Sequence, residues 1–183
     1  MANLRALHSM LILASFGSGG AMAQEAMTGY VAGGGAFVMH TQASESGSRL
    51  NYKLEFARVV KNISAELRFG TGLNYKDYGG TLKGFWHFNF QDPTTSATGI
   101  SLGLGAGAMH SGTGTVLTGM RGFTDIVIHP FVRFLWDSRF NVGGVIEAGM
   151  DWVPYRTYTG TGTTADSTTR LRFYVGAGIA IGA

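Results

Sequence analysis

The sequence predicts an all-β fold: a closed, eight-stranded, antiparallel up-and-down transmembrane β-barrel that follows a cleaved signal peptide. Three observations predict it. Eight segments alternate between apolar and polar residues, and a period of two is that of a β-strand. Each segment has roughly ten or more residues, as a tilted strand needs to cross a bilayer, whereas strands of soluble proteins average about five or six. The connections alternate in length, as expected when the short turns share one rim.

The first 23 of the 183 residues have the features of a secretory signal peptide. Arg5 precedes the short apolar run SMLILASF, and AMA at 21–23 fits the small-x-small cleavage rule. We therefore expect residues 24–183 to form the barrel as a single domain, the alternative being a retained anchor or a short buried helix. No apolar run reaches the length of about 18 that predicts a transmembrane helix. The chain has no cysteine for disulfide or thiolate chemistry.

The first four predicted strands all show the alternation. Residues 29–40 read GYVAGGGAFVMH, with glycines between two apolar ends. Residues 49–59 read RLNYKLEFARV, where Leu, Tyr and Phe alternate with Asn, Lys and Glu. Residues 63–75 read ISAELRFGTGLNY, where an apolar face opposes a carboxylate, a guanidinium and glycines. Residues 81–90 read TLKGFWHFNF, where Leu, Trp and Phe alternate with Lys, His and Asn.

The last four predicted strands continue the pattern. Residues 99–109 read GISLGLGAGAM, with Ile and Leu opposite Ser and Gly. Residues 124–136 read TDIVIHPFVRFLW, and residues 140–152 read FNVGGVIEAGMDW. Residues 170–182 read RLRFYVGAGIAIG. A membrane barrel must close because lipid offers no partner to a free edge, so we expect YVAGGGAFV of the first strand to pair with YVGAGIAI of the last.

The connections place the strand ends at two different rims. Those after the second, fourth and sixth strands read VKN, QDPTTSAT and DSR. The other four read TQASESGS, KDYGG, HSGTGTVLTGMRGF and VPYRTYTGTGTTADSTT, and they include the two longest. Short turns at one rim and longer loops at the other are typical of outer-membrane barrels.

The polar face holds charges of both signs in near balance. Inside a narrow barrel such charges persist when they are paired, although a solvated outer face would have the same composition. Glycines on this face would make room for large neighbours such as Phe85, Phe131 and Tyr174. We therefore predict an ionic network in the lumen that comprises Lys53, Glu55, Glu66, Arg68, Lys83, Asp125, Arg133, Glu147, Asp151, Arg170 and Arg172.

Aromatic residues on the apolar face gather near the strand ends, with Leu, Ile, Val and Ala between them. Two aromatic girdles around an aliphatic band are expected where rings lie at headgroup depth. This distribution favours an outward apolar face over a soluble, lipocalin-like barrel with an apolar interior, which is the alternative fold. The predicted interface aromatics are Tyr52, Phe56, Tyr75, Phe88, Phe90, Phe134, Trp136, Phe140, Trp152 and Phe173.

These strands together resemble the small eight-stranded outer-membrane barrels, which include the transmembrane domain of outer membrane protein A and its single-domain relatives. The resemblance covers residues 24–183 through pattern rather than through a motif. It implies the outer membrane of a Gram-negative bacterium, export through the periplasm, and periplasmic chaperones, the barrel insertion machinery and outer-membrane lipids as partners. Members commonly end in an aromatic residue that is recognised during assembly, whereas this chain ends in Ala183.

The sequence contains few candidates for catalysis or ligand binding. His110 and Ser111 are adjacent, as in a lipid A-modifying hydrolase that pairs a nucleophile with a base, but the pair lacks further support. His87 and His129 face the predicted lumen without metal-ligand spacing. GLGAGA and GTGTTA open no helix for a dinucleotide, and Pro130 indicates a bulge or a weak point in its strand. We therefore predict no catalytic residue, metal or cofactor, and no nucleic-acid partner at a net charge of +3.

The function that these features favour is a structural or surface-interaction role, exerted through loops of a barrel whose polar lumen is largely plugged. Eight strands enclose an interior that side chains can fill, so a wide pore is not expected. The first alternative is a narrow transporter of ions or hydrophobic molecules, because glycines in the lumen could leave a gap. The second is the lipid A-modifying enzyme. The surface partner is not defined by the sequence.

Overall fold

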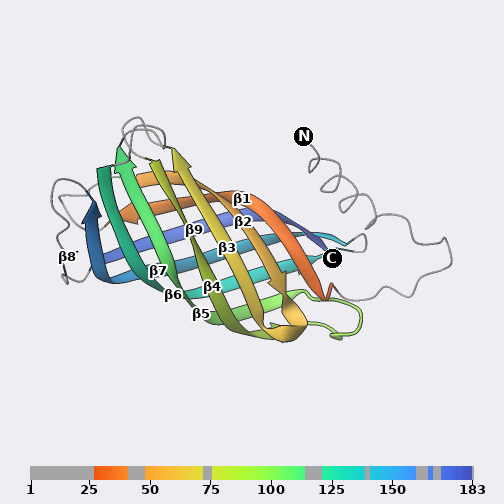
Figure 1. Cartoon of the computed structure of the whole chain (residues 1–183). Helices are drawn as coiled ribbons and strands as arrows, with labels where there is room; N and C mark the ends of the chain where they lie inside the picture. Colours follow the sequence, from red (N-terminus) through yellow and green to blue (C-terminus); the bar gives the residue numbers. More distant parts are fainter. Residues whose placement is uncertain are drawn as a thin grey trace, which may run out of the picture.

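The computed structural model describes residues 27–40, 48–71, 76–113, 121–138, 141–159, 165–166 and 170–182. It contains eight long strands, the two-residue strand β8 (Ala165–Asp166) and one 3-10 turn, η2 (Val59–Lys61) (Figure 1). The long strands are β1 (Gly29–His40), β2 (Ser48–Arg58), β3 (Ile63–Thr71), β4 (Lys76–Asn89), β5 (Gly99–Thr113), β6 (Arg121–Asp137), β7 (Val142–Thr159) and β9 (Arg170–Gly182).

The eight long strands form one closed antiparallel barrel. Each pairs with its neighbour in the sequence from β1 to β7, β7 pairs with β9, and β9 returns to β1. The closing seam aligns Val31 with Ile181 and Val38 with Tyr174, which confirms the expected pairing of the first and last strands. The predicted fold class, an all-β up-and-down barrel of eight strands, is therefore confirmed.

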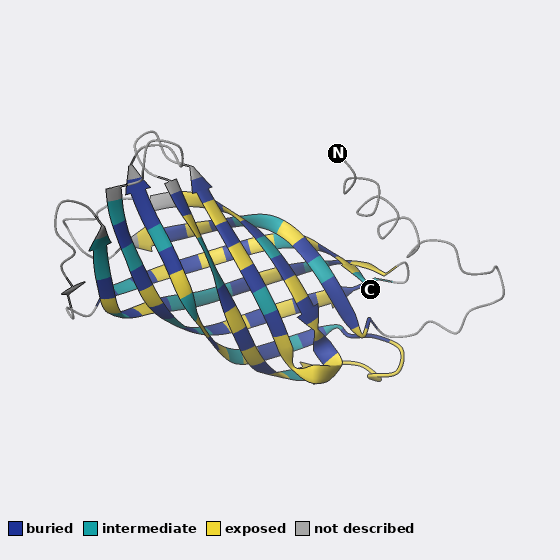
Figure 2. Ribbon diagram, viewed as in Figure 1, coloured by how far each residue is buried: buried dark blue, intermediate teal, exposed yellow. Residues whose placement is uncertain are grey.

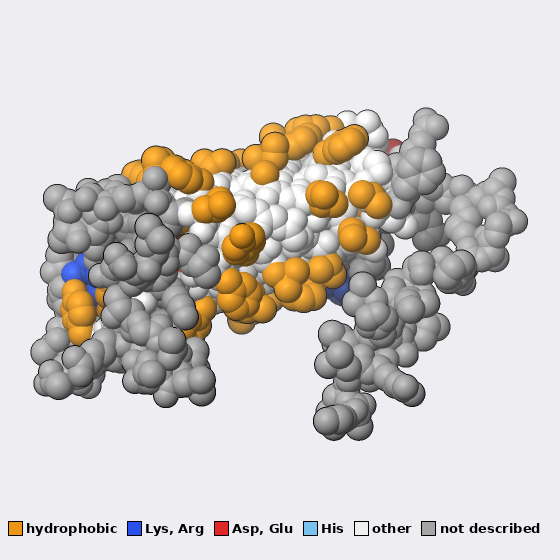
Figure 3. Space-filling model, turned by 90° about the horizontal axis from the view of Figure 1, so that it is seen from above, with side chains coloured by type: hydrophobic (Ala, Val, Ile, Leu, Met, Phe, Trp, Pro, Cys, Tyr) orange, Lys and Arg blue, Asp and Glu red, His pale blue; other side chains and the backbone are white. Residues whose placement is uncertain are grey.

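The apolar side chains cover the outside of the barrel and the charged ones fill the lumen. Buried and exposed residues alternate along every long strand (Figure 2). Leu82 and Trp86 are each 73% exposed, whereas Glu55, on the lumen face, is fully buried. The visible wall carries hydrophobic side chains along its length, and Lys, Arg, Asp and Glu show only near its ends (Figure 3). A lipocalin-like interior does not fit this pattern.

We call the end that holds η2, residues 90–98 and residues 138–141 the short-turn rim, and the opposite end the long-loop rim. Two non-glycine residues with positive φ occur in the described part of the chain, Asn62 (φ 55) and Asn141 (φ 54), and both lie in these short turns. Asparagine tolerates this left-handed conformation better than most residues. In the turn after β4, the Asp92 carboxylate accepts hydrogen bonds from the Thr94 amide (2.9 Å) and hydroxyl (2.7 Å). These bonds lower the pKa of Asp92 below its ordinary value.

The strands extend further toward the long-loop rim than the alternation predicts. Residues 76–80, 110–113, 121–123 and 153–159 were expected in loops. All of them lie in strands, and every one except Pro154 has a partner in the ladder. These segments are rich in glycine and polar residues, so their apolar alternation is weak, but the main-chain ladder continues through them. Three ends among the described residues differ in the other direction: Val59 lies in η2, Phe90 follows β4, and Asn141 precedes β7. Among the described residues, no helix is long and apolar enough to cross a membrane.

The one register shift between β6 and β7 lies between Ile126 and Ile128 and not at Pro130. Ile126 pairs with Tyr155 and Ile128 with Trp152, so β7 advances by one extra residue at this point. Of the two alternatives expected at Pro130, the bulge is therefore wrong, whereas the missing β6–β7 pair at this residue fits the other, a weak point in the strand. The register across Pro130 is unbroken, although the β6–β7 ladder has no pair at His129 or Pro130, as a residue without a backbone N–H requires.

Candidate functional site: an ion-pair network inside the barrel

Fourteen charged side chains are buried among the described residues, and their signs balance. Seven are basic: Lys53, Arg68, Lys83, Arg133, Arg156, Arg170 and Arg172. Seven are acidic: Glu55, Glu66, Asp77, Asp125, Asp137, Glu147 and Asp151. All eleven lumen residues named from the sequence belong to this set. Arg156, Asp77 and Asp137 were missed because they lay in segments assigned to loops or turns.

The middle of the lumen is organised around Glu66 of β3. One of its carboxylate oxygens lies 2.6 Å from Nζ of Lys53 on β2 and 2.6 Å from Nζ of Lys83 on β4. The cross-strand register aligns Glu66 with Glu55 and Lys53 with Arg68, and like charges directly opposite one another are unfavourable. The contacts that form are therefore diagonal to the ladder. Lys53 also reaches Glu147 of β7 at 3.0 Å.

Two ion pairs join strands on opposite sides of the barrel. Arg68 of β3 donates through Nη1 to Asp151 of β7 at 2.9 Å. Arg133 of β6 pairs with Glu55 of β2 and donates through Nε to Glu147 at 2.6 Å. In the order of eight strands, β3 and β7 are four steps apart, and so are β2 and β6. The side chains of this layer thus span the whole width of the lumen.

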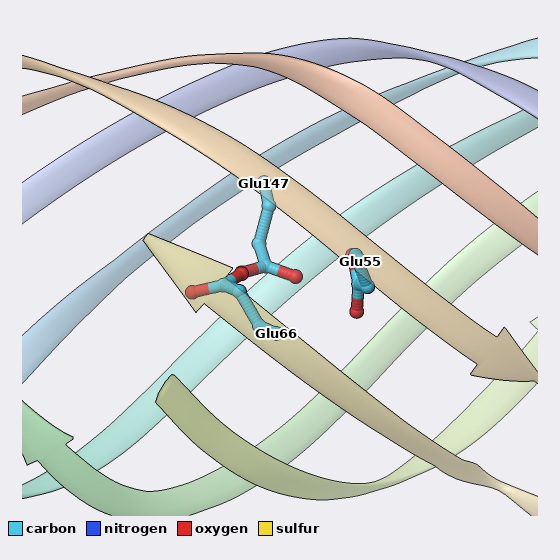
Figure 4. A group of neighbouring side chains, drawn as sticks. All are labelled: Glu55, Glu66 and Glu147. Atoms are coloured by element: carbon cyan, nitrogen blue, oxygen red, sulfur yellow. The ribbon is translucent and has the colours of Figure 1, made fainter. Parts of the chain in front are cut away.

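Three carboxylates, those of Glu55, Glu66 and Glu147, come within 4.8 Å of one another from β2, β3 and β7 (Figure 4). Such a group has the donors of a hard-cation site. Here Lys53, Lys83 and Arg133 lie against the same oxygens. Arg68 also contacts Glu66, so four cations lie against these three anions and the carboxylates are engaged in ion pairs.

Aromatic rings separate the charges in this layer. The Arg68 guanidinium lies 4.4 Å from the ring centre of Tyr174, and the Arg133 guanidinium 4.8 Å from that of Phe131. His129 stacks on Phe131 at 5.7 Å, and its Nδ1 is 2.7 Å from a carboxylate oxygen of Asp151. Cation–π contacts of this kind are attractive where water is excluded. His129 is thus bound within the network, whereas the sequence had placed it only on the lumen face.

Glycines in the lumen wall lie directly against these rings. A Cβ atom added to Gly103 would lie 2.5 Å from Cζ of Phe131, and one added to Gly149 would lie 3.0 Å from Cε1 of Tyr174. Only glycine lets the rings approach the backbone so closely. The space over Gly105 is taken by the Lys83 side chain, 3.0 Å from such an atom. The space over Gly103 and Gly105 is therefore occupied by the side chains of Phe131 and Lys83.

A second ionic layer lies nearer the long-loop rim. The Asp125 carboxylate accepts two hydrogen bonds from Arg156, at 2.5 and 2.8 Å, and one from Arg172 at 2.5 Å. The Arg156 guanidinium lies 3.5 Å from the ring centre of Phe123. Arg170 donates to the Tyr158 hydroxyl at 3.4 Å. Planar, bidentate pairs of this type hold both partners in a defined orientation.

Apolar side chains form a buried cluster at the short-turn rim. The cluster comprises Met27, Tyr30, Ala32, Ala57, Val59, Ala97, Leu135, Val145 and Ala180. The Asp137 carboxylate accepts hydrogen bonds from the backbone N–H groups of two cluster residues, Met27 (3.3 Å) and Ala97 (3.0 Å). His87 contacts the Ser101 hydroxyl and the Ala97 carbonyl oxygen, each at 2.9 Å, near this end of the lumen. Among the described residues, it belongs to no group that could hold a metal ion.

His110 and Ser111 lie on opposite faces of β5 and do not form a dyad. Ser111 is buried in the lumen. His110 lies on the outer side, where it is 2.9 Å from the Thr124 hydroxyl and 5.0 Å, ring centre to ring centre, from Tyr78. Neighbouring residues of a strand point to opposite faces. Two residues adjacent in a strand therefore cannot contact each other as a nucleophile and its base must.

Eight of the ten predicted interface aromatics belong to the described residues, and all eight are exposed. They are Tyr52, Phe56, Phe88, Phe90, Phe134, Trp136, Trp152 and Phe173. Tyr75 and Phe140 lie outside the described residues. The outer face also exposes aromatic residues that the prediction left out, namely Phe37, Phe69, Tyr78, Trp86 and Tyr155.

Comparison with known proteins identifies the fold. No protein-family model matches the chain, and no curated protein matches it. Among solved structures, the chain is similar to Neisserial surface protein A, with a TM-score of 0.58 and 13% sequence identity, over 85% of this chain and 97% of the other. At this identity the likeness concerns the fold, and it confirms the predicted resemblance to small eight-stranded outer-membrane barrels.

Proposed function

We propose that this chain is an integral outer-membrane β-barrel of a Gram-negative bacterium with a closed lumen. In this proposal its role is structural or depends on surface interactions made at the long-loop rim, and it has no enzymatic activity of its own. Outer-membrane lipids would surround the apolar wall, and periplasmic chaperones and the barrel insertion machinery would assemble it.

The observation that carries the proposal is that two ion pairs cross the lumen: Arg68 with Asp151, and Arg133 with Glu55. A hydrated pore needs a continuous polar path, and here the polar side chains are joined to one another across the full width. Apolar side chains over the whole outer wall support a lipid environment, because a soluble protein rarely exposes so large a patch.

Planar-bilayer conductance tests the closed lumen. We expect the purified protein to insert without stable openings. The double variant Arg133→Ala/Glu55→Ala removes one crossing pair without leaving an unpaired partner between the two, and we expect it to conduct. Lys61→Ala, on the exposed turn η2, is the matched control, and we expect it not to conduct. Large, stable openings of the unmodified protein would contradict the proposal.

Cysteine labelling tests the surface role, since the chain has no cysteine of its own. We expect a membrane-impermeant maleimide to label Thr163→Cys, in the connection between β7 and β9, on intact cells. Thr94→Cys, in the exposed turn at the short-turn rim, should react only after the outer membrane is broken. The reverse pattern would mean that the long-loop rim faces the periplasm and would remove the basis for a surface interaction.

A further inference from the structure

The outer wall carries a groove of about 590 Å³ that crosses β1, β2, β3 and β4 near the short-turn rim. Residues that pair with one another across these four strands form a row, and the outward side chains of two such rows form the sides of the groove. Val31, Phe56 and Leu82 belong to one row, and Arg58 and Ile63 belong to the other. The backbone of the row between them, from Tyr30 to Lys83, forms the floor.

Two small residues keep the groove open. Ala65 lies between Phe56 and Leu82 in the first row, and Gly84 lies beside Ile63 in the second. A Cβ atom added to Gly84 would meet no heavy atom within 4 Å, so the space above it is free. The flanking side chains are well exposed, Leu82 at 73% and Ile63 at 55%. Four strands at the usual spacing make the groove about 14 Å long.

One cation stands at the end of this apolar groove. Arg58 is the last residue of β2 and is exposed on the outer face. Its aliphatic stem lies over Gly29, with Cδ 3.1 Å from the position of an added Cβ. Arg58 makes no ion pair with any residue that the structure describes. A guanidinium that has no ion-pair partner among the described residues, at the rim of an apolar wall, is suited to a phosphate.

The groove runs from the rim toward the middle of the wall. Arg58 ends its strand, whereas Gly84 and Leu82 lie five and seven residues before the end of β4 at Asn89. A glycerophospholipid has the same polarity along its length: a phosphate at the surface and an acyl chain that extends into the hydrocarbon. The groove matches such a lipid in charge and in direction.

We propose that the groove binds one glycerophospholipid, with its phosphate at Arg58 and an acyl chain over Ala65 and Gly84. The site rests on the proposed membrane location, and it belongs to the leaflet at the short-turn rim. The loops at the long-loop rim take no part in it.

Native mass spectrometry of the detergent-solubilised protein, titrated with dioleoyl phosphatidylglycerol, tests the site. We expect the unmodified protein to retain one lipid. Arg58→Gln removes the cation and should weaken retention about tenfold, the effect of losing one charge-assisted contact. Gly84→Leu fills the groove and should weaken retention because it excludes the acyl chain. Gly33→Leu is the control for bulk, because Gly33 also has free space but lies outside the groove. Lys61→Gln is the control for charge at the same rim. Both should retain lipid normally.

Two further ligands define the chemistry. Dioleoylglycerol, which lacks the phosphate, should bind about tenfold more weakly than phosphatidylglycerol, and inorganic phosphate alone should not bind. Equal retention by Gly84→Leu, Arg58→Gln and the unmodified protein would overturn the site, as would equal binding of dioleoylglycerol. Heat-dependent gel mobility shows that each variant is folded. A protein that stays in solution without detergent would instead contradict the proposed membrane location.

Discussion

Arg68 and Asp151 face each other across the lumen, 83 residues apart in the sequence, with 2.9 Å between Nη1 and the carboxylate oxygen. Each has a second partner: Arg68 also contacts Glu66, and Asp151 also contacts His129. The pair therefore connects β3 with β7 and joins two halves of the network. Both groups are buried, so water does not compete for this contact.

We predict that Arg68 and Asp151 are energetically coupled. Arg68→Leu or Asp151→Leu alone leaves a buried charge without its main partner, which typically costs about 3–5 kcal/mol. The double variant should lose less than the sum of the two, with a coupling of about 0.5–3 kcal/mol. Denaturant unfolding in vesicles, followed by tryptophan fluorescence, measures all four proteins. In the control cycle, Arg68→Leu is combined with Asp137→Leu, whose contacts are to Met27 and Ala97. That cycle should be additive.

We predict that Gly103→Ala destabilises the barrel by about 1–3 kcal/mol through overpacking. The new methyl group would lie 2.5 Å from Cζ of Phe131 and 2.5 Å from the Gly84 carbonyl oxygen. Phe131→Leu in the same chain should recover only part of the loss, because the carbonyl oxygen stays. Gly33→Ala reduces the freedom of the unfolded chain equally but meets no atom within 4 Å. Equal unfolding midpoints for the two alanine variants would refute the packing role of Gly103.

Alternation along the strands separated the residues into two faces, and the aromatic residues near the strand ends indicated which face points outward. Together these two signals place Glu66 and Arg68 in the lumen and Leu67 on the outer wall. The partners do not, because the register aligns Lys53 with Arg68 and Glu55 with Glu66. The ion pairs inside the lumen depend on the paths that the long charged side chains take from one strand to another. The sequence carries little information about these paths.

The strand ends at the long-loop rim could not be predicted for a related reason. Arg156 was assigned to a loop because the surrounding segment is rich in threonine and glycine, and Asp77 lay in KDYGG. Both are buried strand residues, held by ladders that continue beyond the apolar belt. Closure of the barrel supplies a partner to every strand on both sides, so weak local propensity does not end a strand there.

We predict that the carboxyl group of Asp92 titrates below the ordinary value for aspartate, because the Thr94 amide and hydroxyl stabilise its charged form. The pKa is lowered in the folded state. Its contribution to stability is therefore present above the unfolded pKa and is lost as the pH falls through the folded one. Carbon-detected NMR of the carboxyl group measures the pKa.

Thr94→Ala should raise the pKa of Asp92 toward its ordinary value by removing the hydroxyl donor. Thr95→Ala is the matched control, since the Thr95 hydroxyl donates to the main-chain carbonyl oxygen of Asp92 at 3.1 Å and does not reach the carboxylate. It should leave the titration unchanged. If both substitutions shift the titration equally, the turn as a whole and not the Thr94 hydroxyl lowers the pKa.

The last prediction concerns the outer wall. Leu104 lies in the central part of β5, is 57% exposed, and pairs with Gly84 and Pro130 on the two adjacent strands. In water, Leu104→Arg would be a surface substitution within about 0.5 kcal/mol of neutral. At the centre of a bilayer, arginine on the lipid face of a barrel costs about 2–4 kcal/mol, and the cost falls to about 0–1 kcal/mol near the interface. We therefore expect Leu104→Arg to destabilise the barrel strongly in vesicles, while Val60→Arg on η2 at the short-turn rim stays close to neutral. Unfolding midpoints in vesicles measure both, and because the two side chains are similarly exposed, equal effects would mean that the wall around Leu104 is not embedded in hydrocarbon.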